Sequence, residues 1–126
     1  MKQVLLDSNF ILTCVKQKID FIEDLTQKGI QIIVPQQVLD EIKRVSESKK
    51  KLKFRDDAKI SIKILEINKS KIKIIDFESK KHVDNLIIKH AKENPEMLIA
   101  TLDNELKKKI PNKILIIKEK KRIGIQ

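Results

Sequence analysis

Four acidic residues lie at positions from which their carboxylates can meet in one site. Asp7 and Asp103 each directly follow a short apolar run, in VLLDSN and IATLDNEL, that predicts a buried strand. By helical spacing, Glu41 lies on the apolar stripe of one predicted helix and Asp84 flanks the buried face of another. Acidic groups placed in this way repel one another, and burial penalises each of them further. A divalent cation with oxygen ligands relieves both penalties, so the pattern predicts a centre for one or two Mg²⁺ or Mn²⁺ ions.

Such a centre suits hydrolysis of phosphodiesters, because the cation activates a water and neutralises the charge that develops on the phosphate. For any one acid alone, a structural role as a helix cap or as a partner of lysine is the alternative, and the four together favour the metal centre. The polar neighbours that could support it are Ser8, Asn9, Asn85, Thr101 and Asn104. Ser8 or Asn9 would equally suit the cap of the first helix, as Asp103 or Asn104 would suit that of the last.

The chain around these acids is strongly basic, with a formal net charge of +10. Two stretches, residues 43–55 and 105–122, each carry a surplus of six positive charges. A polyanion such as RNA or DNA is the natural partner of this charge, and solvated lysine without a partner is the alternative. The residues predicted to contact phosphates are Lys49, Lys50, Lys51, Lys53, Arg55, Lys107, Lys108, Lys109, Lys120, Lys121 and Arg122. Because the chain has four Phe and neither Trp nor Tyr, we expect phosphate contacts to dominate over base stacking.

Short apolar strands alternate with amphipathic helices along the chain. Strands are predicted at 3–6, 31–34, 71–75, 97–100 and 113–117, and helices at 9–15, 19–28, 36–46, 55–68, 80–92 and 104–109. This alternation predicts an α/β fold, a three-layer α-β-α sandwich around a central parallel sheet of about five strands. One domain is expected at 1–117, followed by a basic tail at 118–126. Ligands of such sheets bind outside the carboxyl ends of the strands, which is where Asp7 and Asp103 lie.

Composition narrows the classes further. The chain has no apolar run long enough to span a bilayer and no N-terminal pattern of a signal peptide, so a cytoplasmic protein without membrane contact is expected. Its one cysteine, Cys14, cannot form a disulfide within the chain and is expected in the core. Two glycines are too few for a Rossmann fingerprint or a P-loop.

The segments VLLDSNFIL, VPQQVLDEI, HVDNLIIKHA and ATLDNELKKKI, in this order, resemble those of the PIN-domain ribonucleases. The resemblance implies an endoribonuclease whose Mg²⁺/Mn²⁺ site consists of Asp7, Glu41, Asp84 and Asp103. Within the family the chain looks most like small archaeal PIN proteins, which are similar to the endonuclease of the small-subunit processome. It therefore implies an rRNA precursor as substrate and a ribosome-assembly partner. VapC-type toxins share the pattern and imply an antitoxin partner instead, and a homodimer is compatible with either relationship.

Two positions depart from the family pattern. Many relatives carry a second acid where this chain has Asn85, and relatives often read Thr-Asn-Asp where it has Leu102 between Thr101 and Asp103. Losing a ligand charge weakens a second metal site, so one-metal chemistry stays open. Two other classes also stay open: an RNA-binding assembly module without catalysis, and a signalling domain of receiver type. The second needs paired acids after the first strand, but Ser8 and Asn9 follow Asp7.

Overall fold

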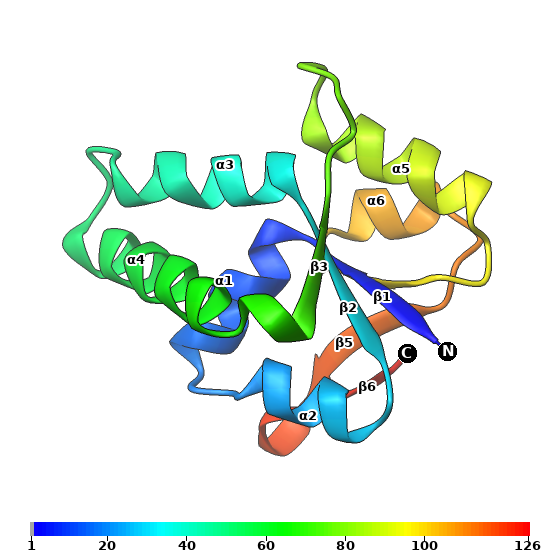
Figure 1. The fold of residues 1–126 in the computed structure, drawn as a ribbon, viewed down its shortest axis with the longest axis horizontal. Helices are drawn as coiled ribbons and strands as arrows, with labels where there is room; N and C mark the ends of the chain where they lie inside the picture. The colour runs from blue at the N-terminus through cyan, green and yellow to red at the C-terminus, as the bar shows by residue number, and fades with distance from the viewer. Residues whose placement is uncertain (1) are drawn as a thin grey trace.

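Six strands form one sheet in the order β3-β2-β1-β4-β5-β6, with helices packed around it (Figure 1). The structure, a computed structural model, describes residues 2–126. The strands are β1 (Gln3–Leu6), β2 (Gln31–Pro35), β3 (Ile72–Ile75), β4 (Leu98–Ala100), β5 (Ile114–Lys118) and β6 (Arg122–Ile125). The α-helices are α1 (Ser8–Lys16), α2 (Phe21–Gln27), α3 (Gln36–Ser46), α4 (Leu52–Ile67), α5 (Val83–Glu93) and α6 (Asn104–Lys108). Short 3₁₀ turns, η1 (Lys69–Lys71) and η2 (Glu119–Lys121), precede β3 and β6.

The first five strands run parallel, as the alternating pattern predicted, and the expected α/β sandwich is confirmed with six strands in place of five. β1 lies between β2 and β4, with Val4 opposite Ile32 on one side and Leu98 on the other. The chain runs outward from β1 through β2 to β3, then returns to β4 on the other side of β1. The carboxyl ends of β1 and β4 therefore flank a topological switch point, where sheets of this type bind ligands.

The central strand is apolar on both faces because helices cover both. Val4, Leu5 and Leu6 are all fully buried, a continuous run that is typical of parallel strands rather than of half-exposed ones. Cys14 also lies in the core, as expected, and burial raises the pKa of its thiol to about 12. That raised pKa leaves almost no thiolate at neutral pH, so the cysteine is chemically inert.

Helices α1, α3 and α4 pack against one another at the left of the molecule in Figure 1, while α5 and α6 lie at its upper right. α4 begins at Leu52, three residues earlier than predicted, so only 47–51 connects it to α3. Its buried face contains the small residues Ala58 and Ser61, which allow the close approach of α3. The Ser61 hydroxyl donates to the carbonyl oxygen of Asp57, so its polar group stays satisfied inside the helix pair. No helix within residues 2–126 combines the length and the apolar character needed to cross a membrane.

The structure corrects the expectation of a basic tail at 118–126. β5 continues to Lys118, and after a turn β6 pairs antiparallel with it, Ile117 opposite Ile123. Lys120 and Lys121 make the turn in the left-handed region, with φ of 61° and 57°. The segment resembles a tail because five of its first six residues are charged and β6 has only two apolar residues besides its glycine. Their alternate spacing places Ile123 and Ile125 on the same face of the strand, as in a half-exposed edge strand; Ile123 is buried, and Ile125, at the end of the strand, is partly exposed.

The two isoleucines of β6 provide a matched test of this strand. Ile123 is 6% exposed and Ile125 is 40% exposed. Ile123→Ala should lower the free energy of unfolding by about 3 kcal/mol because it leaves a cavity under the sheet edge. Ile125→Ala should cost well under about 1 kcal/mol. Urea unfolding followed by circular dichroism measures both, and equal small effects would mean that the segment behaves as a tail in solution.

Candidate functional site

Asp7 lies at the switch point and is almost fully buried, with 2% of its surface exposed. Its backbone N–H donates to Ala100 at 2.9 Å, which extends the pairing of β1 with β4 by one residue. Three donors hold its carboxylate: the Ser8 N–H at 2.8 Å, the Thr101 hydroxyl at 2.8 Å and the Asn9 amide at 3.2 Å. These contacts fix the orientation of the carboxylate where β1 leaves the sheet.

Burial raises the pKa of the Asp7 carboxyl from its ordinary 3.8 to about 6. The hydrogen bonds from Thr101 and Ser8 lower the pKa, and the charges of Glu41 and Asp84 raise it. Glu41 on α3 and Asp84 on α5 therefore lie within electrostatic range of Asp7, which follows β1, although burial is the larger cause of the raised pKa.

Glu41 comes from α3, which begins directly after β2 and therefore at the same sheet edge. Val38 and Ile42 on this helix are fully buried, and Glu41 beside them is half-buried, as its helical phase predicted. Its carboxylate accepts a hydrogen bond of 2.5 Å from the Ser8 hydroxyl. Ser8 thus connects Glu41 to the turn that carries Asp7.

Asp84 lies in the first turn of α5, with 42% of its side chain exposed. The Nδ1 atom of His82 is 3.9 Å from its carboxylate. The preceding loop is tied to α3 through Gln37, whose amide donates to the Asp76 carboxylate at 2.8 Å and whose carbonyl accepts from the Phe77 N–H at 3.2 Å. Sequence reasoning missed Gln37, although it stands one helical turn before Glu41 and therefore on the same face.

Asp103 follows β4 and caps α6. Its carboxylate accepts from the N–H groups of Glu105 at 2.9 Å and Leu106 at 3.3 Å. Its own N–H donates to the Thr101 hydroxyl at 3.2 Å, and that hydroxyl in turn donates to Asp7. Thr101 therefore links the carboxylate of Asp7 to the backbone of Asp103.

The supporting residues divide into two groups. Ser8, Asn9 and Thr101 contact the acids directly, and the Asn9 carbonyl also accepts from the Leu102 N–H at 3.1 Å. Asn85 and Asn104 are exposed on α5 and α6. The expectation that Ser8 or Asn9 caps the first helix is corrected, because the N-cap of α1 is Asp7. A carboxylate followed by a helix caps it through the same N–H groups that orient it.

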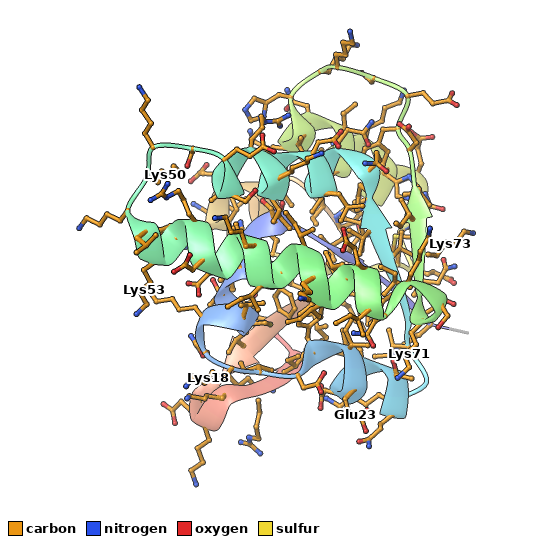
Figure 2. All side chains as sticks on the ribbon, turned by 60° about the vertical axis from the view of Figure 1, so that its left-hand side comes forward. Lys18, Glu23, Lys50, Lys53, Lys71 and Lys73 are labelled. Carbon is orange, nitrogen blue, oxygen red and sulfur yellow. The ribbon has the colours of Figure 1, made fainter. Side chains whose placement is uncertain are left out.

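The basic residues that were predicted to contact phosphates lie in three separate places. Lys49, Lys50 and Lys51 occupy the connection between α3 and α4, with Lys53 and Arg55 in the first turn of α4. Figure 2 shows Lys50 and Lys53 at the outer end of this helix pair. Lys107, Lys108 and Lys109 end α6, the helix that Asp103 caps. Lys120, Lys121 and Arg122 lie at the turn between β5 and β6. There, Lys121 and Arg122 line a cavity of about 560 Å³ together with Asp20, the N-cap of α2, and Asp24 within α2.

The donor chemistry of this site fits a hard divalent cation. Its candidate ligands are carboxylate oxygens, and the pKa of Asp7 is raised because burial outweighs the hydrogen bonds to its carboxylate. Among residues 2–126, however, no three His, Cys, Asp or Glu side chains stand close enough to hold one ion by themselves. Mg²⁺ commonly binds through one or two carboxylates, several waters and substrate phosphates, which matches an open arrangement of this kind.

The titration of Asp7 gives a testable pH dependence. Above pH 6 the ionised carboxylate costs stability, about 3 kcal/mol for a pKa raised from 3.8 to about 6. The cost disappears as the pH falls from 6 to below 3.8, where Asp7 is protonated in the folded and the unfolded chain alike. Asp7→Asn lacks this titration. Its stability relative to wild type, from urea unfolding in EDTA, should therefore be most favourable above pH 6 and become less favourable by pH 4. A difference that does not change with pH would contradict the raised pKa.

Comparison with known proteins identifies relatives in sequence and solved structures with a similar fold. Ribonuclease VapC4 of Methanocaldococcus jannaschii is 27% identical over 131 residues, which cover 99% of this chain and 97% of that protein. The solved PIN domain endonuclease Utp24 has a TM-score of 0.78 at 23% identity, covering 98% of this chain and 90% of its own. VapBC2 from Rickettsia felis, solved bound to a DNA fragment from its promoter, has a TM-score of 0.62 at 21% identity and covers 90% and 98%. The model of the PIN-like domain matches residues 4–122. The chain thus belongs to the PIN-like domain family, which confirms the resemblance to the PIN-domain ribonucleases drawn from its sequence.

Proposed function

We propose that this protein is a metal-dependent endoribonuclease that hydrolyses RNA phosphodiesters. The observation that carries the proposal is the buried carboxylate of Asp7, whose pKa is raised by burial and by the charges of Glu41 and Asp84 at the switch point of the sheet. A structural carboxylate gains nothing from further acids within electrostatic range, whereas carboxylates are the ligands that a hard cation prefers. Membership of the PIN-like domain family supports the same activity.

The residues that would hold Mg²⁺ or Mn²⁺ are Asp7, Glu41, Asp84 and Asp103. When bound, the ion supplies an activated water and neutralises charge on the phosphate. The chain itself supplies the orientation: Ser8 holds Glu41, and Thr101 connects Asp7 with Asp103. The backbone N–H groups at the start of α6 neutralise part of the Asp103 charge. Lysines around the site would hold the phosphates on either side of the cleaved bond.

For the biological role, we propose processing of an rRNA precursor during assembly of the small ribosomal subunit, in the cytoplasm. The fold shared with the Utp24 endonuclease and the basic surface are compatible with a structured RNA substrate. A ribosome-assembly partner and a homodimer belong to this proposal as predictions.

A VapC-type toxin with an antitoxin partner is the second candidate, and the full-length similarity to Ribonuclease VapC4 favours it. The roles differ in what the enzyme does to its host. A toxin arrests growth when expressed alone, whereas a processing enzyme shortens an rRNA precursor at one site. An assembly module without catalysis would bind RNA whether or not metal is present.

Asp103→Asn tests the catalytic role of the acid that ends β4. Asparagine caps helices as well as aspartate does, so α6 should persist while a ligand charge is lost. Cleavage of a structured rRNA fragment should occur with wild type in Mn²⁺, stop in EDTA, and fall at least about a hundredfold in the variant. RNA binding should stay equal or tighten, because one negative charge is gone.

Asp20→Asn is the matched control, since Asp20 caps α2 in the same way through the Glu23 N–H at 3.0 Å. It should cleave like wild type. Equal loss of cleavage and binding in the Asp103 variant would contradict a catalytic role. RNA binding by wild type without cleavage under every metal condition would favour the assembly module.

The lysines that end α6 should contribute to RNA affinity through phosphate contacts. Replacing Lys107, Lys108 and Lys109 with Ala should weaken binding and reduce the slope of log affinity against log salt by about 2, at roughly 0.7 for each phosphate that is no longer neutralised. The control replaces Lys69, Lys71 and Lys73, three exposed lysines at the β3 edge, two of which are labelled in Figure 2. A fluorescence-anisotropy titration at several salt concentrations measures both slopes, and equal slopes would exclude the α6 lysines from the interface.

A further inference from the structure

A groove beside the acidic site is lined by α1, by the connection between α3 and α4, and by the start of α4. Its cavity volume is about 710 Å³. Leu12, Val45 and Phe54 are apolar residues of its lining, and Lys16 and Lys49 are among its lysines. The groove therefore combines apolar and cationic side chains.

The groove is continuous with the acids through Asn9. This residue lines the groove, donates to the Asp7 carboxylate at 3.2 Å and accepts from the Leu102 N–H at 3.1 Å. From Asn9 to Lys16 the wall follows α1 over roughly 10 Å, at the usual helical rise. A chain cut beside Asp7 has to continue away from the site, and this groove offers a direct course.

Phe54 distinguishes this groove from the rest of the surface. The four phenylalanines all lie within the described residues, and Phe10 and Phe21 are buried in the core. Phe77 is half-buried with its ring 5.4 Å from that of His90. Phe54 alone among the four is well exposed, at 47%. An exposed aromatic ring between lysines is the combination with which proteins hold single-stranded nucleic acid.

The charge of the lining favours RNA as the occupant. Lys16, Lys49, Lys50 and Lys51 stand against one acid, Asp57, so the groove carries a local surplus of three positive charges. Phosphates can pair with the lysines of the lining while a base lies against its apolar residues. A folded duplex cannot insert a base in this way, so the groove suits an unpaired strand.

We propose that this groove holds the single-stranded RNA that extends from the cleavage site, with one base stacked on Phe54 and its phosphates on Lys49–Lys51. The inference rests on the proposed nuclease function and adds a subsite to it. It also modifies the expectation, drawn from the low aromatic content, that base stacking plays little part. One ring suffices where the groove has room for one base.

Because the chain has no Trp or Tyr, a single tryptophan becomes a clean reporter. Phe54→Trp is the test variant, and Leu52→Trp is the matched control, two residues away on α4, 63% exposed and outside the groove. A short single-stranded RNA of mixed sequence, titrated in EDTA, should quench the fluorescence of F54W and leave that of L52W nearly unchanged. Inorganic polyphosphate, which carries the charge without bases, should quench neither.

Phe54→Ala should weaken binding of the same RNA about tenfold, and Leu52→Ala should leave it unchanged. Unaltered RNA affinity in F54A, with cleavage intact in wild type, would overturn the subsite while the nuclease proposal stands. Equal quenching of F54W by polyphosphate would overturn stacking. If wild type cleaves no RNA but F54W is quenched as expected, the nuclease proposal fails and the RNA-binding groove stands.

Discussion

The carboxylate of Asp7 lies where β1 leaves the sheet, and keeping a negative charge buried there constrains several distant segments at once. Its donors come from the start of α1 and from the end of β4, so these two elements have to meet at a fixed register. Parallel pairing of β1 with β4 supplies that register, and the Asp7 N–H continues it. The charge is only partly compensated, because burial outweighs the hydrogen bonds in setting the pKa of Asp7. The fold therefore positions an acid that it does not neutralise, which is the condition for binding a cation.

Negative and positive side chains of this protein lie at different depths below its surface. Buried Asp7 lies at the sheet edge within electrostatic range of Glu41 and Asp84, and lysines extend from the ends of helices and from turns into water. An approaching polyanion would experience the outer charge first, over a distance of about a Debye length, and the acids only on contact. A cation between the acids and the phosphate removes the repulsion that otherwise opposes that contact. A polyanion could therefore contact both the lysines and the acids only with a cation bound between the acids and its phosphates.

Periodicity predicted the central fold because it reflects burial. Apart from β3, which Lys73 interrupts, the parallel strands have continuous apolar runs, and most helices have an apolar stripe. Both kinds of element could therefore be predicted, together with the strand ends that carry Asp7 and Asp103. The inward phase of Glu41 followed from Val38 and Ile42. Hydrogen bonds between residues far apart in the chain could not be predicted from the sequence. The bond from Ser8 to Glu41 joins residues 33 positions apart, and the tether of Gln37 to Asp76 joins residues 39 apart. β6 was missed because its apolar pattern is short and the residues before it are charged. An edge strand of this composition cannot be distinguished from an exposed tail by sequence.

The two edge strands of the sheet, β6 and β3, are protected by different means against pairing with a foreign strand. At one end the chain reverses, and β6 closes the parallel array with an antiparallel strand of four residues that begins at Arg122. At the other end β3 is also four residues long and presents Lys73 in an exposed position, with exposed Lys69 and Lys71 just before it. Short strands and positive charge both discourage the addition of a foreign strand. Copies of this protein can therefore come close together at high concentration without their sheets merging, and contacts between them are left to the helical faces.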